Sequence, residues 1–420
     1  MNRQSDSINK YLPAALLYFF LNGFLLPVGL LYTALLTPLL LLWVARYRYL
    51  NYFLLYFLLL TPFVIAHWAN GIENGAYYLK SILLSFTVLV FCIAFHQYLG
   101  FCHSLRDIFK KILLINGFMV VVALVALFIP ALRDSFWNAN TMSLSHHNIL
   151  RLKMLTYEPS YYSTLFAPIA LYYVLKVVRK ELHRPAVYVL LVLVPLFLSL
   201  SFGVILGLAM TLLVLFTLHG RQLLFRARNL QYIAGVVLLL AIVMITLFAF
   251  FPENVFFRRL ENILAGKDTS FNGRTFDSFI LSMDIARKKS LMWGAGFGQV
   301  KVVGLDLYRK FYNDGSFTVS DVAIPNSIGD LLATLGLVGV GLKLFLETFF
   351  FFRSGVWSNY YRLGLFIFIF AYQFTGSFIS NIAEYAIWIL AFKPDLFPEF
   401  NKSGPHRSRT RAISESTQTL

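Results

Sequence analysis

The chain has 420 residues, of which 58% are hydrophobic and only 13% are charged. A soluble domain carries about a quarter charged residues, so this composition argues against a soluble enzyme, a disordered scaffold and a DNA-binding module. The net charge of +16 does not by itself indicate a nucleic-acid partner, because membrane proteins gather positive charge on their cytoplasmic side. The composition therefore predicts a polytopic membrane protein.

Apolar runs along the chain predict an all-α protein with about twelve transmembrane helices. A helix that crosses a bilayer needs roughly 20 apolar residues. The runs fall at about 11–26, 28–45, 50–66, 76–95, 108–130, 161–178, 186–201, 203–219, 231–250, 327–348, 360–380 and 382–397. The first run resembles a secretory signal, but no small-residue cleavage site follows it, so we expect a retained helix.

The basic turns between these runs predict the orientation. With a cytoplasmic N-terminus, every short basic turn falls on one side, together with the basic C-terminal tail. The net charge is then about +15 on the cytoplasmic side and about +1 outside. We therefore expect both termini in the cytoplasm. Cys92 and Cys102 are too few for a disulfide framework, and neither resembles a metal ligand.

Loop lengths divide the chain into four parts. These are residues 1–251, with nine helices and a shorter outer loop at about 131–160; 252–326, a long outer loop; 327–400, with three helices; and 401–420, a disordered cytoplasmic tail. Long loops on compact bundles usually carry function, although a small subdomain without chemistry remains the alternative.

The long outer loop contains an amphipathic pattern. In RTFDSFILSMDIARKK the apolar face is formed by Phe276, Phe279, Ile280, Met283 and Ala286. This pattern predicts a helix that lies at the outer membrane interface and does not span the bilayer.

Ionisable residues gather at the predicted outer ends of the helices. Lys80, Glu158, Asp330 and Glu384 lie at or near the outer ends of four predicted spans, Arg151 and Lys153 lead into Glu158, and Arg274 precedes the amphipathic helix. Charges at a bilayer edge are costly, so each is a functional candidate. Snorkelling explains any one of them as well, but explains the whole group poorly.

Glu158 has the most informative neighbour. Pro159 has no backbone N–H and suits the first turn of a helix, so Glu158 is expected at a helix N-terminus. The helix dipole favours a carboxylate there, while burial raises its pKa, and a general base needs a balance of the two. Dipole complementation without catalysis remains an equal alternative.

Three further motifs favour structural interpretations. Gly203 and Gly207 form a small-residue face that allows close helix packing. The glycine-rich stretch 294–298 lacks the preceding strand and the Lys-Ser/Thr pair of a nucleotide loop. The pair His146-His147 lacks a second ligand cluster, so we expect no metal site there.

Five blocks lie in order between about residues 150 and 390. They read LRLKMLTYEPSYYS, LFLSLSFGVILGL, FNGRTFDSFILSMDIARKKSLMWGAGFGQV, PNSIGDLLATLGLVGVGL and FTGSFISNIAEYAIW. In order and placement they resemble the polysaccharide repeat-unit polymerases (Wzy) and O-antigen ligases of bacterial envelopes. The fifth block is most similar to the colanic-acid type of polymerase. The first four or five helices match only in hydropathy.

The resemblance implies a GT-C-like bundle in the bacterial inner membrane that acts as a glycosyltransferase at the periplasmic face, without nucleotide sugar, metal or other cofactor. Donor and acceptor would both be glycans on undecaprenyl pyrophosphate, joined into O-antigen, capsule or exopolysaccharide. The resemblance leaves open a chain-length regulator protein as a further partner, and it implies no nucleic acid.

The resemblance also assigns residues. Arg274 matches the outer-loop Arg of the family, and Glu158 matches the Glu of its EPS block. Pro325 stands where the ligases have a candidate catalytic His, while Asn326 is retained as a substrate-binding position. Ser201-Phe202 replaces a Ser-Arg pair, so one family cation is missing.

The expected mechanism combines the resemblance with the chemistry of these groups. Arg274 and Arg151, supported by Lys153 and Lys80, would hold the donor pyrophosphate, because Arg meets phosphate oxygens in a bidentate manner. Glu158 would deprotonate the acceptor hydroxyl.

Other side chains near these groups remain open alternatives. Asp330 or Glu384 would serve as the base if Glu158 does not. Four aromatic residues would stack on sugars or form an interfacial belt: Tyr157, Tyr161, Tyr162 and Trp293.

Two other functions compete with polymerisation. A ligase would transfer finished glycan to another acceptor, and Pro325 argues against it. A transporter of lipid-linked oligosaccharides would show related halves and polar residues at the midplane, whereas the charges here are expected at one depth.

Overall fold

The computed structural model describes residues 12–27, 30–46, 51–102, 104–141, 148–224, 261–262, 265–266 and 269–402. The predicted helix at 231–250, the pair His146-His147 and the tail from residue 403 lie outside the described residues. The first two residues of the predicted tail, Asn401 and Lys402, contact Asn359 and Ser358.

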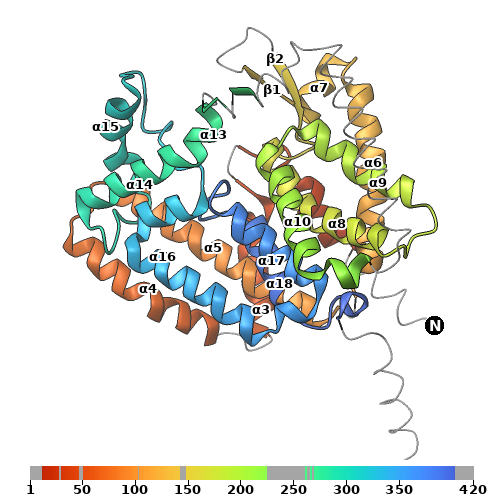
Figure 1. The fold of residues 1–420 in the computed structure, drawn as a ribbon. Helices are drawn as coiled ribbons and strands as arrows, with labels where there is room; N and C mark the ends of the chain where they lie inside the picture. The colour runs from red at the N-terminus through yellow and green to blue at the C-terminus, as the bar shows by residue number, and fades with distance from the viewer. Residues whose placement is uncertain are drawn as a thin grey trace, which may run out of the picture.

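The chain is mostly helical (Figure 1). The described elements are η1 (Leu17–Leu21), α2 (Tyr32–Leu35), α3 (Thr37–Arg46), α4 (Asn51–Ala69), α5 (Gly75–Gly100), α6 (Arg106–Ala126), α7 (Pro130–Phe136), β1 (Trp137–Thr141), β2 (Asn148–Leu152), α8 (Pro159–Val178), α9 (Pro185–Ser199), α10 (Phe202–Leu224), α13 (Thr269–Arg274), α14 (Phe276–Lys289), α15 (Val300–Tyr312), α16 (Ser327–Arg353), η2 (Val356–Ser358), α17 (Tyr360–Tyr372), α18 (Ile382–Phe392) and η3 (Pro398–Phe400).

Six of the described helices are long and apolar enough to cross a membrane. They are α4, α5, α6, α8, α10 and α16, and shorter apolar helices of 10–17 residues accompany them. The prediction of an all-α membrane protein is therefore confirmed in class, while the expected number of about twelve spans is not established.

Several predicted runs end or break where local backbone chemistry requires it. The run 28–45 is divided between α2 and α3 at Leu36. The run 382–397 ends with α18 at Phe392, since Pro394 forces the preceding Lys393 into an extended conformation.

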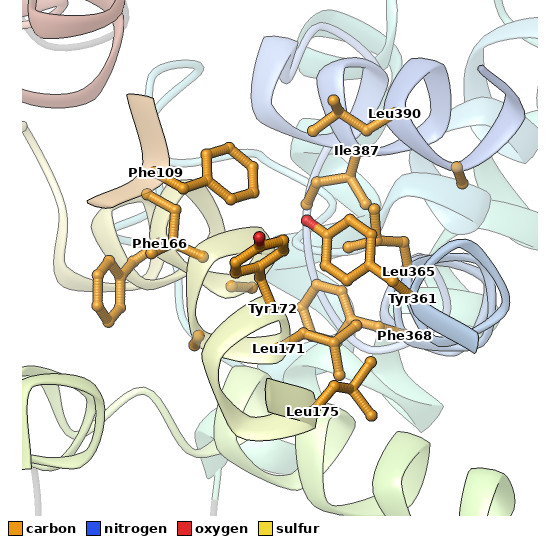
Figure 2. Close-up of a cluster of buried hydrophobic side chains, with 14 of the residues drawn as sticks. Phe109, Phe166, Leu171, Tyr172, Leu175, Tyr361, Leu365, Phe368, Ile387 and Leu390 are labelled. Atoms are coloured by element: carbon orange, nitrogen blue, oxygen red, sulfur yellow. The ribbon is translucent and has the colours of Figure 1, made fainter. Parts of the chain in front are cut away.

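Helix α8 forms the centre of the core. Its apolar face packs against α17 and α18, and Figure 2 shows Leu171, Tyr172, Leu365 and Phe368 meeting there. Two tyrosine hydroxyls in this core have hydrogen-bond partners: Tyr361 donates to the carbonyl of Pro168 at 2.9 Å, and Tyr172 donates to the Glu399 carboxylate at 2.7 Å. A central helix buried on nearly all sides fixes the position of its own N-terminus, where Glu158 stands.

The predicted small-residue face of α10 is confirmed as a packing surface. A Cβ on Gly207 would lie 3.1 Å from the Phe368 ring, and one on Gly203 would lie 3.6 Å from the Tyr372 ring. The two glycines therefore let α10 approach α17 closely.

Helix α16 is broken at Gly336, which has φ 67° and ψ −166°. The glycine-rich stretch fills this break: Ala295 and Gly296 donate to the carbonyls of Ala333 and Thr334 at 2.8 and 3.0 Å. On the other side of the break, the amides of Leu337 and Val338 donate to the carbonyls of Leu291 and Met292. Backbone groups freed inside a membrane helix need such partners, so this stretch has a structural role.

Replacing Gly294 with alanine should therefore destabilise the protein. Gly294 has φ +77°, and a Cβ there would lie 2.4 Å from the carbonyl oxygen of Thr334. We expect a loss of about 1–3 kcal/mol, from the positive φ and the displaced α16 backbone. Thermal unfolding in detergent measures this loss. Gly315→Ala is the control, because no atom lies within 4 Å of its Cβ position. Equal melting temperatures for the two variants would contradict the prediction.

The long outer loop is docked on the turn between α4 and α5. The buried Gln299 side chain accepts from the amides of Glu73 and Asn74 at 3.0 Å each, and donates to the Asn74 carbonyl at 2.8 Å. Lys289 forms an ion pair with Glu73 at 3.1 Å. These contacts hold the described part of the loop against the turn between α4 and α5, at the left of Figure 1. The end of the bundle where α8 begins is called here the outer end.

The predicted amphipathic helix is present as α14. It packs on the protein through a narrow face of Leu281, Ser282 and Ile285, whereas Phe276 and Ile280 are 70% and 48% exposed. Phe276 and Ile280 of the predicted apolar face therefore point away from the bundle, whereas Ala286 of the same face is buried.

The shorter outer loop contains a feature absent from the sequence-based expectations. After α7, strands β1 and β2 form an antiparallel hairpin in which Trp137 pairs with Leu152. The buried Trp137 indole donates to the Ala123 carbonyl at 2.7 Å. The strand WNANT is only five residues long and contains two Asn, a residue type that is depleted in strands, so the sequence-based expectations contained no strand here.

Candidate functional site

Glu158 stands at the N-terminus of α8, as predicted. It is the residue before the helix, with φ −148° and ψ 141°, and Pro159 is the first helical residue. The Ser160 hydroxyl donates to the Glu158 carboxylate. The rest of the carboxylate is accessible, since the side chain is 37% exposed.

The side chains of Arg274 and Glu158 lie next to each other at the outer end of the bundle. Arg274 ends α13, and its Nη2 lies 3.8 Å from Glu158 Oε1, with 34% of the side chain exposed. A separation of 3.8 Å exceeds hydrogen-bond length, and a half-exposed pair of this kind contributes about 1 kcal/mol or less. The pair is therefore loose enough for a ligand to separate it.

The Asn326 side chain fixes the backbone of Arg274. Its Nδ2 donates to the Arg274 carbonyl at 2.7 Å, and its Oδ1 accepts from the Gly329 amide at 2.5 Å as the N-cap of α16. The amides of Ser327 and Ile328 donate to carbonyls of the α17–α18 turn. One buried side chain thus fixes both the Arg274 backbone and the start of α16.

The predicted cations Arg151, Lys153 and Lys80 lie in three different environments. Arg151 donates to the carbonyls of Ser199 and Leu200 at 3.2 and 3.4 Å, which closes the C-terminal end of α9. Lys153 is half-buried; burial lowers the pKa of its ammonium. Lys80 is exposed on α5, and within the described residues no hydrogen bond or ion pair links it to Glu158 or Arg274.

The predicted aromatic residues also separate. Tyr161 and Tyr162 are buried, and the Tyr162 hydroxyl donates to Asn116 at 2.8 Å. Trp293 packs edge-on against Phe63, far along the chain from the α8 terminus. Tyr157 stacks 4.7 Å from Tyr161, and burial raises the pKa of its phenol, which therefore stays protonated. Of the four, Tyr157 lies directly beside Glu158.

The two carboxylates that were the alternatives to Glu158 as the base, Asp330 and Glu384, contact other groups of the protein. Asp330 accepts from the Ile379 amide at 3.0 Å and so ties α16 to the turn before α18. Glu384 is fully buried, and its Oε1 lies 2.6 Å from Lys343 Nζ and 3.2 Å from the Ser327 hydroxyl. A carboxylate in this position contacts the protein interior, not a substrate at the surface.

Lys343 and Glu347 are residues that sequence reasoning missed. Lys343 Nζ lies 3.0 Å from Ser327 Oγ and 3.8 Å from Glu347 Oε1, and Gln373 donates to Glu347 at 3.0 Å. In a straight helix Ser327 and Lys343 would be about 24 Å apart, so the break at Gly336 folds the two halves of α16 toward each other. The signal was two ionisable residues four apart inside an apolar run.

A second missed residue lies in the first helix. Buried Asn22 accepts from the Thr33 amide at 3.0 Å and donates to the Tyr161 hydroxyl at 3.4 Å. It connects the N-terminal helices to α8 next to Glu158. Its position in an apolar run was the available signal.

The five sequence blocks form one continuous set of contacts. The first block contacts the second and the third, the third contacts the fourth, and the fourth contacts the fifth, although long stretches of chain separate them. The contacts are Ser163–Ser199, Glu158–Arg274, Arg274–Asn326 and Asp330–Ile379. The blocks therefore build one site that combines an accessible cation with an accessible carboxylate.

Within the described part of the chain, no group of three or more His, Cys, Asp or Glu residues is arranged to hold a metal ion. Neither a protein-family model nor a curated protein matches this chain.

Proposed function

We propose that this protein is a membrane glycosyltransferase that polymerises glycan repeat units carried on undecaprenyl pyrophosphate into O-antigen, capsule or exopolysaccharide. The observation that carries the proposal is the Glu158–Arg274 contact, made by two residues that the family resemblance selected from separate blocks. The contacts of Asn326, Asp330 and Ser199 with neighbouring blocks support the same site.

The loose ion pair suits the chemistry of glycosyl transfer. A pyrophosphate offers Arg274 a better partner than one carboxylate oxygen at 3.8 Å, because guanidinium and phosphate pair in bidentate fashion. Donor binding would then release Glu158 to accept the proton of the acceptor hydroxyl. The acceptor oxygen bonds to the anomeric carbon, and the bond to pyrophosphate breaks with its electrons going to the phosphate, where Arg274 stabilises the charge.

The proposed setting is the bacterial inner membrane. The full chain would form about twelve spans in a GT-C-like bundle, with both termini cytoplasmic and the Glu158–Arg274 pair facing the periplasm. Supporting this orientation, α13–α15 and the β1–β2 hairpin lie together at the outer end (Figure 1), while Arg179 and Arg353 lie at the opposite ends of α8 and α16. The lipid bilayer, both lipid-linked glycans and, as an open case, a chain-length regulator would be the partners.

A transporter of lipid-linked oligosaccharides is the second candidate. The broken helix α16 and the buried Lys343–Glu384 pair favour it, because transporters often use discontinuous helices with buried charges. A ligase is disfavoured by Pro325, which precedes Asn326 where that family would place its His.

Deletion of the gene in its native host separates these functions. A polymerase deletion should leave single repeat units on the final acceptor, which gel analysis of surface glycan detects. Absent units would indicate a transporter, and polymer stranded on the lipid carrier would indicate a ligase. Restoration by the wild-type chain is the control.

A further inference from the structure

A cavity of about 830 Å³ lies at the end of the bundle opposite the outer end. Gly100, Arg353 and Phe392, the last residues of α5, α16 and α18, all line it. The rings of Phe350 and Phe392 lie 5.6 Å apart and form part of an apolar wall. Gly100 leaves room inside, because a Cβ there would lie 3.8 Å from Lys393 Nζ. The volume is within the range of about 300–1,000 Å³ that small-molecule sites occupy.

Basic side chains line the same cavity as the apolar wall. Arg353 and Lys393 supply two cations, His96 adds an imidazole, and Asp395 supplies a carboxylate. With His96 neutral, these lining residues carry a net charge of +1. Within the described residues the Arg353 guanidinium lies 5.9 Å from the Phe349 ring, and neither Arg353 nor Lys393 forms an ion pair or a side-chain hydrogen bond. The lining therefore matches a ligand with a single negative charge and an apolar part.

The helix ends around the cavity are closed by other groups. Buried Arg362 donates to the carbonyls of Ser354 and Ala391 at 2.7 and 2.8 Å, at the ends of α16 and α18. The carbonyls of Tyr98 and Leu99, at the end of α5, accept from the two backbone amides that follow the helix. Lys and Arg side chains often serve this purpose at helix C-termini. Here the two cations of the cavity are not required for it and remain for another partner.

We propose that this cavity binds the phosphate group of an anionic phospholipid from the leaflet opposite the outer end. Arg353 and Lys393 contact the phosphodiester, and the wall with Phe350 and Phe392 packs against the first methylene groups of the acyl chains. Basic pockets between membrane helices bind lipid headgroups through the same combination of charge and apolar surface. The cavity contains none of the residues of the Glu158–Arg274 site, so this inference does not depend on the proposed function.

The thiol of Cys102 lines the same cavity and reports whether it is occupied. Purified full-length protein in a neutral detergent is treated with N-ethylmaleimide, and labelling of Cys102 is followed by mass spectrometry. Parallel samples contain phosphatidylglycerol, phosphatidylcholine or inorganic phosphate at one concentration, about ten times the Kd for phosphatidylglycerol. Labelling should slow about 10-fold with phosphatidylglycerol, because only protein with an empty cavity reacts. The neutral lipid and inorganic phosphate should protect the thiol much less.

Arg353→Gln combined with Lys393→Gln tests the two cations. We expect phosphatidylglycerol to bind about 25-fold more weakly, roughly 5-fold for each cation, so that almost no protection remains. Arg287→Gln combined with Lys310→Gln is the matched control, because it removes the same two charges from exposed positions on α14 and α15. Each variant is compared with itself in the absence of lipid, which cancels any change in the reactivity of the thiol.

Four results would overturn the inference. They are wild-type labelling that phosphatidylglycerol does not slow, equal protection by phosphatidylcholine, full protection in the variant of Arg353 and Lys393, and an equal loss of protection in the matched control. Protection by inorganic phosphate equal to that by phosphatidylglycerol would replace the lipid with free phosphate as the ligand, and would overturn the lipid assignment. The gene-deletion experiment tests polymerisation separately.

Discussion

Arg274→Ala is expected to lower polymer synthesis about 100- to 1,000-fold, as removal of a group that stabilises developing charge does in other enzymes. The arginine is bound to the fold through its backbone carbonyl, which Asn326 contacts, so truncating the side chain leaves that anchor intact. Protein amount and membrane insertion should therefore stay normal. Glycan length on gels, normalised to protein in the membrane fraction, measures the effect in the native host.

Three companion variants sharpen this result. Glu158→Gln keeps the shape of the side chain and removes the base, so it should also abolish long chains. Arg274→Lys tests the bidentate requirement, and full activity would show that a point charge suffices. Arg287→Ala removes the same charge from an exposed position on α14 and should change nothing. Wild-type polymer lengths in Glu158→Gln would remove that residue from the base role.

Lys343→Ala is expected to have the largest effect on stability. In the wild type the Lys343 ammonium lies 2.6 Å from the carboxylate of fully buried Glu384. The variant leaves both Glu384 and Glu347 without this cation. Breaking a buried ion pair from one side costs about 3–5 kcal/mol. The fraction unfolded in a denaturant titration of detergent-solubilised protein measures this cost.

The partner variants distinguish an unpaired charge from lost packing. Lys343→Met combined with Glu384→Gln and Glu347→Gln removes all three charges and keeps the side-chain volumes, so it should recover most of the lost stability. Lys310→Ala, on the exposed surface of α15, should leave stability unchanged. If Lys343→Ala unfolded at the same denaturant concentration as wild type, the network would carry no net stabilisation.

The position of Glu158 shows what local sequence was able to predict. Pro159 fixes the start of α8 through its own ring geometry, without reference to any distant residue, and the structure begins the helix there. The helix α14 and the glycine face of α10 were predicted for similar reasons, because periodicity along one helix is a local property.

The break in α16 shows what local sequence was unable to predict. The run 327–348 is apolar throughout and was predicted as one span, yet Gly336 turns the chain because residues 291–296 supply partners for the freed backbone groups. That turn also brings Lys343 to Ser327 and Glu384. The family resemblance assigned Glu158 and Arg274 separately, but nothing in the sequence predicted that their side chains would contact each other.

Taken by itself, the sequence determined the membrane class, the main apolar helices and the residue types available for chemistry, since hydropathy and helix-start signals act within a few residues. Only the tertiary structure decided which charges are free and which are engaged. Arg151 closes a helix and Glu384 is paired inside the bundle, whereas Glu158 and Arg274 stay accessible to each other and to a ligand. Those differences depend on contacts between distant segments, which form only when α8, α13, α16 and α18 pack together.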